Sequence, residues 1–69
     1  MQRSVLTERE REIFVLLTKN NTTKEIANIL NISEKTVRNH ISNTMQKLGV
    51  KGRAGAVVEL IKLNEISLL

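Results

Sequence analysis

Three helix-start signals in a fixed order constrain the fold of this 69-residue chain more than any other feature. Thr7 is followed by Glu10, and Thr22 is followed by Glu25 at the same spacing. In such a capping box, the threonine oxygen and the glutamate carboxylate each accept a hydrogen bond from a backbone N–H at the helix start. Ser33 is a typical N-cap for a further helix. Together these signals predict an all-α fold.

Four helices are predicted from the caps, the apolar spacing and the residues that stop a helix, at residues 8–19, 23–30, 34–48 and 53–64. Asn20 and Gly49 are the expected stops of the first and third helices, because both residue types adopt the left-handed conformation that ends helices. A short second helix, a turn and a longer capped third helix form a helix-turn-helix pattern. The length supports one small domain over residues 1–69.

The third predicted helix has one apolar stripe. Val37, Ile41, Thr44 and Leu48 recur at the spacing of a single helix face, which we expect to point into the core. The Thr44 hydroxyl can bond back to a helix carbonyl while its methyl packs. Ile32 precedes the Ser33 cap and is placed to pack on Val37 as a hydrophobic staple, which would fix the angle between the second and third helices.

The opposite face of the same helix carries Lys35, Arg38, Asn39, Ser42, Asn43 and Gln46, without an acidic side chain. Such side chains make bidentate or forked hydrogen bonds to base edges, and the DNA major groove admits one α-helix. A polar face that serves only solubility is the alternative, but it would normally include Glu and Asp. The composition therefore favours a DNA-reading helix.

The chain has no cysteine and a single histidine, His40. Thiolate metal sites are therefore excluded, and a set of nucleophile, base and acid cannot be assembled. We expect no cofactor, no metal and no enzymatic activity. His40 is interpreted as a residue at the edge of the core, or as a phosphate contact.

The net charge of +4 and the pI near 10.0 point to a polyanionic partner, either nucleic acid or an anionic membrane. No apolar run approaches the about 20 residues of a membrane span. The N-terminus becomes polar at once, so we expect no signal peptide. We expect a cytoplasmic, nucleoid-associated protein without a membrane partner.

Four stretches of the chain also match a known family pattern: LTERERE, TTKEIA, ISEKTVRNHISNTMQKLGVKGR and AVVEL. In this order they resemble the LuxR-type helix-turn-helix domain of bacterial transcription regulators, over residues 5–63. The resemblance implies double-stranded DNA as partner and a homodimer that pairs through the fourth helix. It is strongest to free-standing members that control late sporulation genes, and RNA polymerase is a further candidate partner. Activation and repression both stay open.

The family's DNA-reading positions fall on residues that also point outward, and these are our expected base contacts: Arg38, Asn39 and Ser42. The expected phosphate contacts are Thr22, Thr23, Lys24, Lys35, Thr36, Lys47, Lys51 and Arg53, since helix N-termini and cations bind phosphate. Alternatively, Arg53 forms an ion pair with Glu10. The expected dimer contacts are Val58, Leu63 and Ile66, with the apolar tail residues Leu68 and Leu69 beyond them.

The sequence leaves two other interpretations open. In the first, the chain is the isolated DNA-binding effector domain of a larger two-component response regulator or quorum-sensing regulator. In the second, it is a helical interaction module whose basic helix binds an acidic protein. Salt dependence separates DNA binding from the second alternative, because neutralising phosphates releases counterions.

Overall fold

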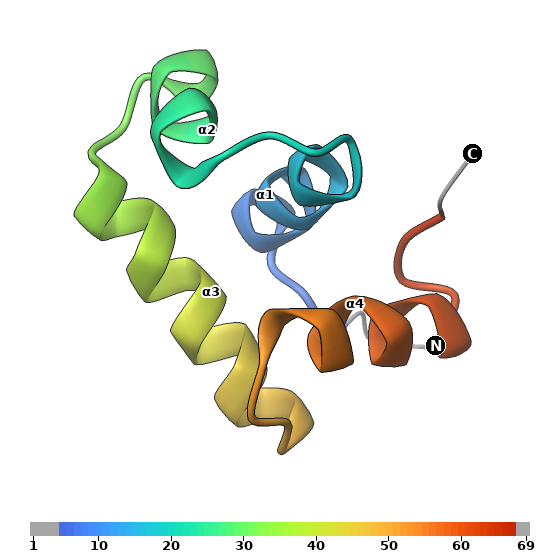
Figure 1. Cartoon of the computed structure of the whole chain (residues 1–69). Helices are drawn as coiled ribbons and strands as arrows, with labels where there is room; N and C mark the ends of the chain where they lie inside the picture. The colour runs from blue at the N-terminus through green and yellow to red at the C-terminus, as the bar shows by residue number, and fades with distance from the viewer. Residues whose placement is uncertain (1–4, 68–69) are drawn as a thin grey trace.

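The computed structural model describes residues 5–67. They form four helices, α1 (Glu8–Thr18), α2 (Thr23–Leu30), α3 (Glu34–Leu48) and α4 (Arg53–Lys62), as Figure 1 shows. No strand occurs among these residues, and the predicted all-α, four-helix class is confirmed. Helices α2 and α3 have the predicted bounds, whereas α1 ends one residue earlier than predicted and α4 two residues earlier.

The helix starts are built as the sequence indicates. The Thr7 hydroxyl accepts from the Glu10 N–H at 3.2 Å, and the Glu10 carboxylate accepts from the Thr7 N–H at 2.9 Å. The Thr22–Glu25 box repeats this pair of bonds at 3.1 and 2.7 Å. At α3, the Ser33 hydroxyl accepts from the backbone N–H of the third helical residue at 3.0 Å. Each cap satisfies backbone donors that a helix start otherwise leaves unpaired.

Left-handed residues end the elements and turn the chain. Asn20 and Gly49 both have a φ of 67°, at the two predicted stops. Asn31, with φ 58°, makes the turn between α2 and α3, and Asn64, with φ 59°, reverses the chain after α4. Asparagine adopts this conformation more readily than most residues. The turn at Asn31 lies where the sequence predicts a turn between the second and third helices, whereas the left-handed Asn64 was not predicted.

The core lies where α1, α2 and α4 pack against α3. Ile13, Phe14, Ile26, Val37 and Leu60 are all fully buried, each with 0% of its surface exposed. These five side chains come from all four helices. Because three helices support α3 from behind, its position is set by packing and its opposite face is left exposed.

The predicted stripe of α3 faces the core, although Leu48 at its end is only partly buried. Val37 and Thr44 are fully buried, and Ile41 is 2% exposed. The Thr44 hydroxyl donates to the His40 carbonyl at 2.9 Å, as predicted, so a polar atom enters the core without being left unpaired. Ile32 is half-buried and packs against the core cluster to which Val37 belongs.

The segment after α4 differs from the prediction. Ile66 was predicted to lie at a dimer interface, but it is 7% exposed and belongs to the core. The prediction for Ile66 is wrong because Asn64 reverses the chain and directs the following residues back onto the domain. Leu68 and Leu69 lie outside the described residues. No helix in the described part of the chain is long and apolar enough to span a membrane.

Candidate nucleic-acid interface

The exposed polar side of α3 is the candidate reading face, which we define as Lys35, Arg38, Asn39, Ser42, Asn43 and Gln46. All six are exposed. They are carried on the same helix as the buried Val37, Ile41 and Thr44, so the core holds the reading face in place from the other side. The structure thus presents Arg38, Asn39 and Ser42, the three predicted base contacts, together on one accessible surface.

Within the reading face, Arg38 has one weak internal partner. Its guanidinium lies 4.0 Å from the Glu34 carboxylate, one turn earlier, and the two side chains are 55% and 45% exposed. Ion pairs of this kind at the surface contribute about 0–1 kcal/mol. A guanine edge or a phosphate can therefore replace Glu34 at little cost.

The starts of α2 and α3 present backbone and side-chain donors. Thr22 and Lys24 are exposed and Thr23 is half-buried at the start of α2. At α3, the Ser33 hydroxyl lies 2.9 Å from the half-buried Thr36 hydroxyl, which retains a proton for a further acceptor. Helix N-termini combine unpaired N–H groups with the positive end of the helix dipole, and both features favour phosphate.

At the other end of α3, the predicted phosphate contacts have different surroundings. Lys51 and Arg53 are exposed between α3 and the first turn of α4. Lys47, by contrast, donates to the Glu10 carboxylate at 2.6 Å and to the Val5 carbonyl at 3.2 Å. The alternative pairing of Glu10 with Arg53 is therefore wrong, since the ion-pair partner of Glu10 is Lys47.

Glu10 is a buried carboxylate, with 3% of the residue exposed. Burial by itself would raise the pKa of Glu10. Hydrogen bonds from Lys47 and Thr7, together with the charge of Lys47, outweigh that effect and hold the pKa below its ordinary value of 4.5. Glu10 is thus kept charged by the N-cap of α1 and by a lysine of α3.

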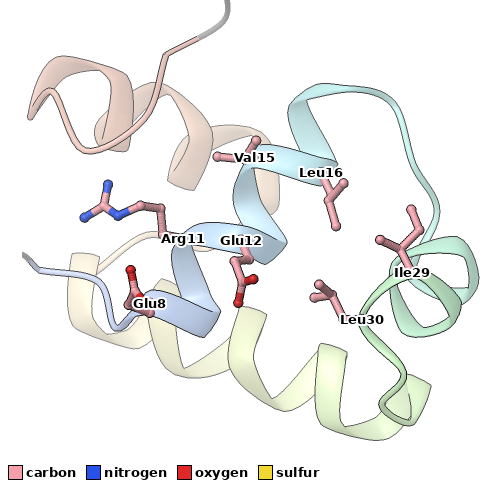
Figure 2. Close-up of a pocket in the computed structure, with 7 residues that line it drawn as sticks. All are labelled: Glu8, Arg11, Glu12, Val15, Leu16, Ile29 and Leu30. Atoms are coloured by element: carbon pink, nitrogen blue, oxygen red, sulfur yellow. The ribbon is translucent and has the colours of Figure 1, made fainter.

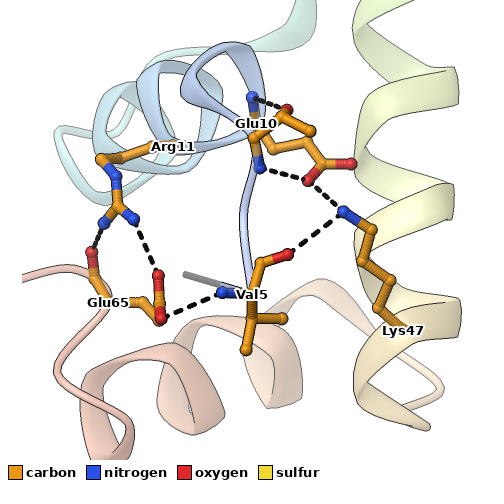
Figure 3. Close-up of polar contacts among 6 residues, drawn as sticks. Val5, Glu10, Arg11, Lys47 and Glu65 are labelled. Atoms are coloured by element: carbon orange, nitrogen blue, oxygen red, sulfur yellow. Dashed lines mark hydrogen bonds and ion pairs between the residues drawn. The ribbon is translucent and has the colours of Figure 1, made fainter. Parts of the chain in front are cut away.

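A second ion pair continues the same group of contacts. Arg11 donates to the Glu65 carbonyl and, at 2.8 Å, to the Glu65 carboxylate. That carboxylate also accepts from the Val5 N–H at 3.2 Å. We call Val5, Glu10, Arg11, Lys47 and Glu65 the polar clasp (Figure 3), because it joins the segment before α1, the end of α3 and the segment after α4.

The sequence analysis missed the polar clasp as a unit. Its ion pairs join residues 54 positions apart, Arg11 and Glu65, and 37 positions apart, Glu10 and Lys47. No local pattern marks such pairs. One signal was available, because Glu10 belongs to a capping box and also lies on the buried side of α1, where a carboxylate needs a cation.

The candidate dimer surface is smaller than predicted. Val58 and Leu63 are 51% and 48% exposed, at the middle and the end of α4. Ile66 does not contribute to it, because it lies in the core.

His40, the single histidine of the chain, is half-buried at the edge of the core. Among residues 5–67, no group of three His, Asp or Glu side chains is arranged to hold a metal ion.

Comparison with known proteins supplies a family. Residues 4–60 match the family model of bacterial regulatory proteins, luxR family. The chain is 69% identical over 64 residues to the spore germination protein GerE of Bacillus subtilis (strain 168), covering 93% of this chain and 86% of GerE. A solved structure of the transcription factor GerE superposes with a TM-score of 0.94 at 64% identity, covering 97% of this chain and 100% of that one.

Longer regulators match over the same region. The transcriptional regulatory protein DegU of Brevibacillus brevis is 50% identical over 84% of this chain, and the match spans 25% of DegU. The nitrate/nitrite response regulator protein NarP of Escherichia coli (strain K12) is 47% identical over 80% of this chain, which is 26% of NarP. The chain therefore spans most of GerE but about a quarter of DegU and of NarP.

Proposed function

This chain belongs to the luxR family of bacterial regulatory proteins, and on that premise we propose that α3 reads the major groove of double-stranded DNA. The protein is a GerE-like transcription regulator with a DNA-binding helix-turn-helix. The observation that carries the reading mode is the reading face of α3, which is polar, exposed and free of acidic side chains. We assign it no catalytic activity.

The geometry of α3 suits the major groove. Its 15 residues make a helix about 22 Å long, and the groove is about 12 Å wide, enough for one helix. An arginine can donate two hydrogen bonds to guanine, and an asparagine can pair with adenine in a bidentate manner. Arg38 and Asn39 therefore read base edges, and Ser42, one turn from Arg38, reads a neighbouring base.

Phosphate contacts flank the reading face and set the register of α3 on the duplex. On one side lie Thr22, Thr23 and Lys24 at the start of α2, with Lys35 and Thr36 at the start of α3. On the other side lie Lys51 and Arg53. Lys47 is assigned to the polar clasp instead, since its ammonium already has two acceptors within the chain.

The protein acts as a homodimer that pairs through α4, with Val58 and Leu63 at the contact. A two-fold contact is self-complementary, so exposed apolar side chains on one helix can supply it. Two reading helices about 34 Å apart would enter successive major grooves of an inverted repeat. Because two apolar side chains make a small patch, we expect the dimer to be weak without DNA.

The dimer is tested by Val58→Asp, which places like charges across the two-fold axis and leaves the core unchanged. We expect a folded monomer, and loss of cooperative binding to a duplex with two half-sites, measured by sedimentation and gel shift. Ile29→Asp is the matched control, because Ile29 is also an exposed aliphatic residue, at 57%, but lies on α2. Cooperative binding that survives Val58→Asp would place the dimer contact elsewhere.

We infer the biological role from the similarity to GerE. GerE-like control of late sporulation genes is the role we assign, in the cytoplasm and on the nucleoid, with RNA polymerase as a further partner. The similarity to DegU and NarP supports a second form, in which this chain is the effector part of a longer regulator. Both forms use the same reading face, so they predict the same DNA contacts.

DNA binding is tested by measuring affinity for random duplex DNA at increasing salt. Lys24, Lys35, Lys51 and Arg53 would each release a counterion, which predicts a slope of log K against log salt of about −4 per chain. A slope near zero, together with binding to an acidic protein, would instead support an interaction module. Cognate sites can then be isolated from genomic DNA by selection.

A further inference from the structure

An open groove of about 360 Å³ lies between α1 and α2, apart from the reading face and the candidate dimer surface. Its floor is apolar and consists of Val15, Leu16, Ile29 and Leu30. Figure 2 shows the side chains of Leu16, Ile29 and Leu30 directed into the space between the two helices. None of the four is a candidate DNA or dimer contact.

The floor continues the hydrophobic core to the surface. Val15, Leu16 and Leu30 are partly buried and pack against the core cluster. Among residues 5–67, Ile29 is the most exposed large hydrophobic residue, at 57%, ahead of Val58, Leu63 and Val5. A single exposed aliphatic residue is ordinary, but Ile29 extends the apolar lining of a groove that is continuous with the core.

The rim of the groove on α1 is acidic. Glu8 and Glu12 lie one turn apart beside the apolar floor. Glu12 has an exposed partner in Arg9 at 3.4 Å, which is a weak surface pair. Arg11 also lines the groove, but its guanidinium is held by Glu65 and points away from the floor (Figure 2). In a chain of net charge +4, this rim repels DNA phosphates and attracts cations.

We propose that this groove docks an amphipathic helix of a protein partner whose apolar stripe is flanked by lysine or arginine. The groove between two packed helices accepts the side-chain ridge of a third helix, and helix-in-groove recognition uses anchors three and four residues apart. The apolar stripe would cover Ile29 and Leu30, and the flanking cations would lie against Glu8 and Glu12.

The docking surface and the reading face can be used together. The groove is built from α1 and α2, whereas the base contacts lie on the exposed side of α3. The partner can thus be recruited to a promoter by a DNA-bound protein. The proposal does not depend on DNA binding, since its test uses the chain alone.

The test uses a synthetic helical peptide of about 14 residues, four turns, with leucines three and four positions apart and lysines beside them. A second peptide carries the same leucines with glutamates in place of the lysines. Both are titrated into the ¹⁵N-labelled chain. We expect the lysine peptide to shift the amide signals of Val15, Leu16, Ile29 and Leu30. We expect the glutamate peptide to bind about three- to tenfold more weakly, because two ion pairs are lost.

Two variants with matched controls locate the binding. Ile29→Gln should weaken binding of the lysine peptide several-fold, and Val58→Gln, which changes a similarly exposed aliphatic residue on α4, should not. Glu12→Gln should weaken it, and Glu34→Gln, which changes another exposed glutamate beside an arginine, should not. Both groove variants should bind DNA as the wild type does.

Several results would overturn the proposal. Equal affinity for the two peptides would show that the acidic rim does not select a basic partner. Signal shifts centred on Val58 and Leu63 would show that the peptide prefers the α4 surface. Self-association that Ile29→Gln abolishes would show that a second copy, and not a basic helix, covers the groove.

Discussion

The reading face and the polar clasp are both rich in charged and polar groups, yet they differ in where those groups find partners. In the clasp, the Lys47 ammonium donates at 2.6 Å to Glu10, which is 3% exposed, and at 3.2 Å to the Val5 carbonyl. On the reading face, by contrast, the Arg38 guanidinium lies 4.0 Å from the Glu34 carboxylate in an exposed ion pair.

The contrast occurs within one helix. Arg38 is near the start of α3 and Lys47 is in its last turn. Both are cations on the predicted DNA-reading helix, and from the sequence both were predicted to contact DNA. The partner inside the fold separates them: Lys47 stabilises α3 against α1, and Arg38 is available to a ligand. A basic residue of a small DNA-binding domain is thus informative only once its intramolecular acceptors are known.

The largest expected effect is on stability, from Lys47→Ala. The variant leaves Glu10 buried without its cation, so we expect the free energy of unfolding to fall by about 1–3 kcal/mol. Urea denaturation at pH 7 measures it. Arg38→Ala is the control and should change stability by about 0.5 kcal/mol or less, as surface substitutions do. If Lys47→Ala keeps its stability and instead weakens binding to all DNA sequences, then Lys47 is a phosphate contact.

The next effect concerns phosphate binding on the DNA side of the comparison. Lys51→Ala removes an exposed cation, so it should lower the affinity for cognate and random DNA alike. The salt slope should become shallower by about 1. Lys19→Ala is a suitable control, since Lys19 is an exposed lysine at the end of α1 that we do not assign to DNA. A loss confined to the cognate site would make Lys51 a base contact.

The smallest expected effect is a pH dependence that belongs to the polar clasp. The pKa of Glu10 in the folded protein is lowered from its usual 4.5, so this carboxylate stabilises the fold at pH values above its unfolded pKa. That contribution is lost as pH falls from about 4.5 through the lower folded pKa. We expect the urea midpoint to fall less between pH 7 and pH 3 in Glu10→Gln than in the wild type. An equal loss in both proteins would assign the acid sensitivity to other carboxylates.

The sequence predicted the features that depend on local spacing. The capping boxes at Thr7 and Thr22 and the buried stripe through Val37 and Thr44 each follow from residues one helical turn apart. The outward direction of Arg38 follows from the same helical period. For this reason the fold class and the location of the reading face on α3 could be predicted from the sequence.

The features that the sequence could not predict depend on distant contacts. The partner of Lys47 lies 37 positions away, on a helix whose orientation is set by packing. Ile66 is apolar and follows the last helix, which fits an exposed interface as well as a buried position. Its burial depends on the turn at Asn64, which directs the chain back onto the domain.

The most direct test of the contrast is the base preference of Arg38→Ala, measured by selecting binding sites from a pool of random duplexes. Wild type, Arg38→Ala and Lys47→Ala are selected in parallel, with each protein confirmed as folded at the working temperature. We expect Arg38→Ala to lose discrimination at one base position in each half-site, by about 1–3 kcal/mol, and Lys47→Ala to select the wild-type site. An unchanged site for Arg38→Ala, or an altered one for Lys47→Ala, would contradict the assignment of Arg38 to DNA and Lys47 to the fold.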